Sequence, residues 1–230
     1  MPRKMTRQPY YTLLASLPPL PRFDRNERLP ISRERLQQRL RMLNVDDARL
    51  LACAAAFLTW QQDAQNLSDL EMVNRFDKMA GFTSTPGLRA IFDFPVDQRT
   101  IMAALRRRHG GFNPPAHKNP WGVGQYVKHI ERNWEAPHFR LAGVYPWLPQ
   151  AKLYIENEDV LNLDRLLKNM LWDHLDQAVP PYDFGFRAVM SYRMKWDMVD
   201  QWLTHDVNKA GERFNALVEE IIHGQPKLFH

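Results

Sequence analysis

The sequence contains very little cysteine and no long apolar run. Its one cysteine, Cys53, cannot form a disulfide within the chain, and it lies in the apolar stretch "LLACAAAFL", where we expect a buried structural thiol. Such usage is typical of a reducing compartment. No run reaches the roughly 20 apolar residues that a membrane-spanning helix needs. The sequence therefore excludes a disulfide scaffold and predicts a protein that is soluble or bound to a membrane only peripherally.

The motifs of several enzyme classes are also missing. The eight histidines form no H-E-x-x-H pair and lie at no ligand spacing from the cysteine, so no metal site is predicted. Gly122 and Gly124 lack a third glycine, and there is neither a phosphate-binding G-x-x-x-x-G-K-[ST] loop nor a G-x-S-x-G elbow. Acidic pairs such as Asp46 and Asp47 lie at expected helix starts, where capping explains them. We expect no cofactor, no direct nucleotide binding and no catalytic site.

Apolar residues recur at helical spacing, and few stretches alternate apolar and polar residues as strands do. With 44% hydrophobic and 25% charged residues, the 230-residue chain has an ordinary globular composition. The predicted fold is mainly α, a multi-helix bundle. In the first half of the chain, helices are predicted to begin at the N-cap Ser32, near Asp46, at the Ser68 capping box and near Val96, the last of them ending at Gly110-Gly111. In the second half, helices are predicted over 122–133, Leu163–Leu175, Val189–Trp202 and Phe214–Ile222, with Asp183 as the cap before the third.

Two proline-rich regions interrupt the helical pattern. The stretch "YYTLLASLPPLPRF", residues 10–23, resembles a signal peptide only weakly, and its prolines favour extended backbone. We expect an ordered strap across the helical body with Tyr10, Tyr11 and Leu14 facing inward. Residues 111–157 combine six prolines with three tryptophans, which predicts a packed irregular region. The expected organisation is one compact unit of three parts: residues 1–110, 111–157 and 158–230.

Basic residues are the strongest functional signal. The chain has 31 Lys and Arg against 26 Asp and Glu, a formal net charge of +5. One arginine cluster could be simply a solvated face, but it is the candidate partner-binding region. Because Glu27 and Glu34 interrupt it, an acidic protein surface is a better partner than nucleic acid. The candidate residues are Arg22, Arg25, Arg28, Arg33, Arg35, Arg39 and Arg41.

Two other functions remain open at this stage. The first is an enzyme of unfamiliar type with a site in residues 121–138, where Trp121, His129, Trp134 and His138 lie. A deep pocket that collects a histidine and a carboxylate there would support it. The second is a basic helical nucleic-acid-binding protein, whose binding should fall steeply as salt rises.

Motifs at both ends of the chain resemble one known family. The N-terminal "YYTLLASLPPL" and "LPISRERLQQRL" and the C-terminal "LLKNMLWDHLDQ" resemble an uncharacterised bacterial family encoded in V-type ATPase operons. The last part of the chain carries the same family's pattern at Phe184, Phe186, Ala188, Tyr192, Trp202, Gly211 and Phe214.

The helix "AVMSYRMKWDMVDQWL" is also distantly similar to the V-type ATPase subunit called d or C, which couples the central stalk to the membrane ring. This chain is shorter and would lack one of that subunit's three lobes. The resemblance implies a non-catalytic subunit or assembly factor of a bacterial V-type ion-translocating ATPase. Its partners would be the rotor stalk and the membrane ring, and its place the cytoplasmic face of the plasma membrane.

Overall fold

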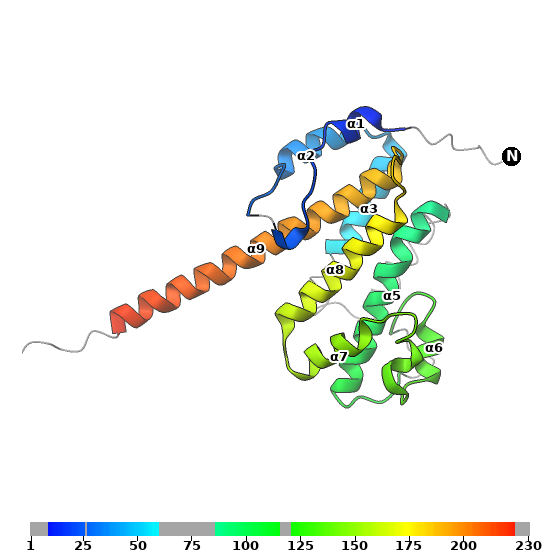
Figure 1. The fold of residues 1–230 in the computed structure, drawn as a ribbon, viewed down its shortest axis with the longest axis vertical. Helices are drawn as coiled ribbons and strands as arrows, with labels where there is room; N and C mark the ends of the chain where they lie inside the picture. Colours follow the sequence, from blue (N-terminus) through cyan, green and yellow to red (C-terminus); the bar gives the residue numbers. More distant parts are fainter. Residues whose placement is uncertain (1–8, 26, 60–85, 116–120, 224–230) are drawn as a thin grey trace, which may run out of the picture.

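A computed structural model describes residues 9–25, 27–59, 86–115 and 121–223. This part of the chain is mainly helical and contains no strand, which confirms the predicted fold class (Figure 1). Its α-helices are α1 (Tyr11–Ala15), α2 (Arg33–Leu40), α3 (Val45–Thr59), α5 (Pro86–His109), α6 (Val127–Arg132), α7 (Leu148–Glu156), α8 (Val160–Ala178) and α9 (Phe186–His223), and two short 3-10 helices are η1 (Phe23–Arg25) and η3 (Pro137–Arg140).

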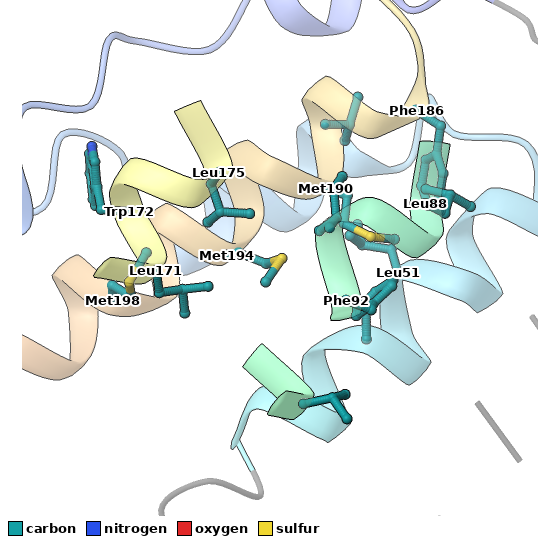
Figure 2. Close-up of a cluster of buried hydrophobic side chains, with 14 of the residues drawn as sticks. Leu51, Leu88, Phe92, Leu171, Trp172, Leu175, Phe186, Met190, Met194 and Met198 are labelled. Carbon is teal, nitrogen blue, oxygen red and sulfur yellow. The ribbon is translucent and has the colours of Figure 1, made fainter. Parts of the chain in front are cut away.

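The centre of the molecule is a cluster of buried apolar side chains from four helices. α8 packs against both α5 and α9, and α3 packs against α9. Figure 2 shows Met190 of α9 beside Leu51 of α3 and Phe92 of α5, in the same cluster as Met194 of α9 and Leu175 of α8. Unbranched methionines fill the irregular spaces where helices cross. The i, i+3, i+4 pattern of the sequence thus becomes the face that each helix buries.

A second cluster explains the tryptophans of the irregular middle. Trp121, Trp134 and Trp147 are all buried against apolar residues of α5, among them Ile101 and Leu105. Burial of large aromatic side chains stabilises this region, in which the helices are short. The prediction of a packed middle is confirmed, but α7 forms a helix in a part that was expected to be irregular. The helix expected over 122–133 is shorter, since α6 covers only Val127–Arg132.

The sequence predicted some helix ends correctly. Ser32 caps α2, its hydroxyl accepting a hydrogen bond from the Arg35 backbone N–H at 3.4 Å. α5 ends at His109, directly before Gly110-Gly111, and Gly111 has a φ of +74°. A left-handed residue at this position is a common helix stop, and glycine adopts it without strain. The helix predicted at Ser68 lies outside the described residues.

Two helix boundaries were predicted wrongly. α5 begins at Pro86, ten residues before the expected start, and Pro95 lies inside it. Proline removes one helical hydrogen bond, but the buried face of Leu88, Ile91 and Phe92 maintains the helix through that point. α9 is a single helix from Phe186 to His223, where two helices were expected. No proline separates the two predicted helices, and one interior glycine is not enough to end a helix.

The N-terminal strap was only partly anticipated. Tyr11–Ala15 forms helix α1 where an extended segment was predicted, because the prolines restrict only the residues directly before them. Tyr10 is buried as expected and Leu14 is half-buried, but Tyr11 is 58% exposed and Leu13 takes its place in the core. Cys53 was expected to be buried and is half-buried.

Candidate functional site

The arginine-rich segment is attached to the body through one tryptophan of α9. The Trp196 side chain is fully buried, and its indole N–H donates a hydrogen bond to the Ile31 carbonyl at 2.9 Å. Ile31 and Leu36 pack on the same ring. Pro30 fixes the backbone just before this contact, and the Ser32 cap then starts α2. The local sequence therefore sets the direction of α2, and Trp196 sets its position.

A second residue of α9 holds the strap beside this segment. The Tyr192 hydroxyl donates a hydrogen bond to the Pro18 carbonyl at 2.9 Å. Tyr192 and Trp196 are four residues apart, so they lie on the same face of α9, one turn from each other. One face of α9 thus fixes two separate stretches of the N-terminal chain relative to each other.

Between these stretches lies a groove with a volume of about 610 Å³. We call it the arginine groove. The strap provides Ser16 and Pro18, and α2 provides two guanidinium groups and an amide. The residues between them are mainly apolar. The full lining is Ser16, Pro18, Leu29, Pro30, Ile31, Ser32, Arg35, Gln38 and Arg39.

Two of the seven predicted arginines are engaged within the protein. Arg22 pairs with Asp173 of α8 at 3.0 Å and donates a hydrogen bond from Nε to Asn169 at 2.9 Å. Arg33 forms an ion pair with Asp200 of α9, and its guanidinium carbon lies 5.7 Å from the centre of the Trp196 ring. These two side chains attach the N-terminal segment to the body, which the sequence alone did not indicate.

The other five arginines are exposed to solvent. None of the ion pairs or side-chain hydrogen bonds among the described residues involves their guanidinium groups. Their positive charges are therefore available to a partner. We call these side chains the arginine surface: Arg25, Arg28, Arg35, Arg39 and Arg41.

An acidic residue lies within the arginine surface. Glu34, in the first turn of α2, is exposed, and hydrogen bonds from its own backbone N–H and from the Ser32 hydroxyl lower the pKa of its carboxyl group. Glu34 is therefore ionised at neutral pH. Glu27 is also exposed. The surface is a set of separated positive charges with negative charges between them.

The region proposed for an enzyme site is occupied by packed side chains. Trp121 and Trp134 lie edge to face with their ring centres 6.4 Å apart, and the Trp121 N–H donates to Glu131 at 3.0 Å. The His129 ring nitrogen Nε2 lies 2.9 Å from the Phe139 carbonyl oxygen. These contacts stabilise the fold, and they leave the Trp121 N–H and His129 Nε2 already paired.

A strained turn follows this region. His138, Phe139 and Arg140 have φ angles of 50°, 53° and 58°, a left-handed conformation that is unusual for residues other than glycine. Arg108 stabilises the turn, since its Nη1 donates to the carbonyls of Trp134 and Ala136 at 2.9 and 2.8 Å.

A cavity of about 270 Å³ lies between the end of α5 and α7, and Arg108 lines it. It brings His109 and Glu156 together, but Glu156 already pairs with Lys152 at 3.1 Å. Burial, then the charges of Lys152 and Arg108, lowers the pKa of His138. The enzyme hypothesis placed its histidine and carboxylate within residues 121–138, but His109 and Glu156 of this cavity lie outside that range.

A buried aspartate fixes the loop that contains Gly122 and Gly124. Asp97 is 2% exposed, and its Oδ2 accepts hydrogen bonds from Gln125 at 2.9 Å and from the Tyr145 hydroxyl at 3.1 Å. Burial raises the pKa of Asp97. Gly124 has a φ of +95°, and an added Cβ would lie 2.6 Å from Asp97 Oδ1. The two glycines therefore allow a close approach of loop and helix, a role that the sequence analysis missed.

The described parts of the chain offer neither a metal site nor a membrane span. Within residues 9–25, 27–59, 86–115 and 121–223, no three of the His, Cys, Asp or Glu side chains that the structure describes form a group suited to a metal ion. No helix of these ranges combines the length and the apolar character that crossing a membrane requires.

Comparison with known proteins gives a family but no activity. Residues 71–225 match the sequence model of a family described as "Protein of unknown function (DUF2764)". No curated protein and no solved structure matches the chain. Because the family match covers well over half of the 230 residues, the chain belongs to the DUF2764 family.

Proposed function

We propose that this DUF2764 protein is a non-catalytic subunit or assembly factor of a bacterial V-type ion-translocating ATPase, and that it couples the central stalk to the membrane ring. The sequence motifs at both ends of the chain resemble a family encoded in V-type ATPase operons. The observation that carries the proposal is the arginine surface, which presents five exposed positive charges, none paired with another described residue, from a segment fixed to α9. Charges held in place in this way favour one orientation of an acidic partner.

The shape of α9 also supports a bridging role. α9 has 38 residues, so at 1.5 Å per residue it is about 57 Å long. Figure 1 shows that its C-terminal half extends beyond the bundle, while its N-terminal half packs in the centre. A helix that is anchored at one end and extends beyond the bundle at the other can contact a second partner at a distance. A rigid connection between two partners is what the coupling of a stalk to a ring requires.

The proposed place of the protein is the cytoplasmic face of the plasma membrane, where it binds through its partners. The rotor stalk and the membrane ring are the proposed partners, and the arginine surface would meet an acidic face of one of them. Attraction between opposite charges also speeds the encounter of the two proteins, and salt weakens it.

Deletion of the gene in its own host tests this function. The amount of each ATPase head and stalk protein on isolated membranes is measured by quantitative mass spectrometry, together with ATP-driven ion transport into membrane vesicles. We expect both to fall and to be restored by a plasmid copy of the gene. Unchanged assembly and unchanged transport in the deletion strain would refute the proposal.

A further inference from the structure

We propose that the arginine groove binds an extended, acidic segment of a partner protein, with two of its carboxylates on Arg35 and Arg39. This inference rests on the proposed function, and it names the chemistry of the partner. Arginine suits such a contact because its planar guanidinium donates two parallel hydrogen bonds to one carboxylate.

The spacing of the two arginines fits an extended chain. Arg35 and Arg39 are four residues apart on α2, so they lie on one face, about 6 Å apart along the helix axis. In an extended chain, side chains two residues apart point the same way and are about 6.6 Å apart. Two acidic residues separated by one residue can therefore face both guanidinium groups at once.

The remaining lining defines the residue between the two acids. The side chain of this middle residue points away from α2, toward the apolar residues Pro18, Leu29 and Pro30. Ser16 and Gln38 can form hydrogen bonds with the backbone of the segment. The groove thus favours an acidic–apolar–acidic pattern.

The groove is held open by contacts that do not involve Arg35 or Arg39. Tyr192 binds the Pro18 carbonyl and Trp196 binds the Ile31 carbonyl, so both sides are attached to one face of α9. A preformed site loses less conformational freedom when it binds, which increases affinity. The same contacts allow Arg35 and Arg39 to be replaced without disturbing the helix packing.

A nucleic acid fits this groove less well than an acidic peptide. The nine described residues of the lining include no aromatic side chain on which a base could stack. The ionised Glu34 in the first turn of α2 repels phosphates and carboxylates alike, so the lack of a stacking surface is what disfavours nucleic acid. Nucleic acid is therefore the alternative outcome that the experiment must separate.

Peptide binding to the purified full-length protein tests the inference. The probe is a fluorescein-labelled peptide with a Glu-Leu-Glu-Leu-Glu core, and the matched control peptide carries Gln in place of each Glu. We expect binding of the acidic peptide only, weakened at least about tenfold in the double variant Arg35→Glu and Arg39→Glu. The control variant, Arg25→Glu and Arg41→Glu, makes the same charge change on the arginine surface outside the groove and should keep most of the binding.

Three results would overturn the inference. They are no binding of the acidic peptide to the wild-type protein, equal loss in the two double variants, and more effective displacement by an oligo-dT strand than by unlabelled peptide. The third result would indicate a nucleic-acid surface. Circular dichroism and thermal melting of both variants, which we expect to match the wild type, verify that each is folded.

Purification from the host separates this inference from the proposed function. If the tagged wild type recovers ATPase proteins and the Arg35→Glu, Arg39→Glu variant recovers them equally well, the groove is refuted and the function remains. If the wild type recovers none but the purified protein binds the acidic peptide through the groove, the ATPase function is refuted and the groove remains.

Discussion

The attachment of the arginine-rich segment to α9 depends on one buried hydrogen bond, and replacing Trp196 by Phe tests it. Trp196→Phe keeps an aromatic ring against Leu36 but removes the N–H that binds the Ile31 carbonyl. Trp147→Phe is a matched control. Trp147 is also buried, but within the described residues its indole N–H has no hydrogen-bond partner. Both substitutions remove the second ring of an indole, so the loss of packing is similar.

The difference between the two variants follows from the hydrogen bond. A buried carbonyl left without its donor costs about 1–3 kcal/mol. Trp196→Phe should therefore lower the free energy of unfolding by about 1–3 kcal/mol more than Trp147→Phe. Removing the unpaired N–H of Trp147 relieves a burial cost, which increases the difference further. For a chain of this length, each kcal/mol corresponds to roughly 2–4 °C in melting temperature.

Urea denaturation followed by tryptophan fluorescence and circular dichroism measures both variants. The comparison is valid if the two probes coincide and the slopes against urea are equal. The reasoning is refuted if Trp147→Phe is as destabilising as Trp196→Phe. Trp196→Phe should also weaken binding of the acidic peptide, because it loosens one side of the arginine groove.

Other predictions concern the Asp97 contacts and the strap. Gly124→Ala should destabilise by about 1–3 kcal/mol, since it strains a left-handed residue and meets Asp97, whereas Gly143→Ala, with no atom near the added Cβ, should change thermal stability by less than about 0.5 kcal/mol. Burial raises the pKa of Asp97, so the stability that Asp97 contributes in its protonated form is lost as pH rises from about 4 through that raised pKa. Asp97→Asn does not titrate, and in urea titrations it should therefore gain stability relative to wild type between about pH 4 and pH 7. Deleting residues 1–20 should lower the melting temperature because Leu13 leaves the core, and an unchanged value would show that the strap is dispensable.

Local chemistry made part of the fold predictable. The apolar spacing of Leu163, Leu171 and Leu175 predicts the face of α8 that is buried, and the Ser32 cap predicts the start of α2. The start of α5 could not be read in this way, because Pro95 has a strong local preference that long-range packing overrides. Helix α1 was not predicted, because the prolines that follow it suggested extended backbone. A proline restricts only the residue directly before it, so Tyr11–Ala15 can still form a helix.

The candidate site was predictable in composition but not in geometry. The arginine cluster is evident in the sequence, yet Arg22 and Arg33 are paired with acids of α8 and α9 more than a hundred residues away. Only the folded chain distinguishes these anchoring arginines from the exposed ones. The groove likewise depends on Tyr192 and Trp196, whose sequence pattern indicates a buried helix and not the segments that it holds.

Affinity purification is the decisive test of the proposed association with a V-type ATPase. The tagged protein is purified from its own host with detergent-solubilised membranes, and the recovered proteins are quantified by mass spectrometry. The proposed subunit role predicts recovery of head, stalk and ring proteins at yields comparable to that of the tagged protein. Recovery of the tagged protein alone would contradict it.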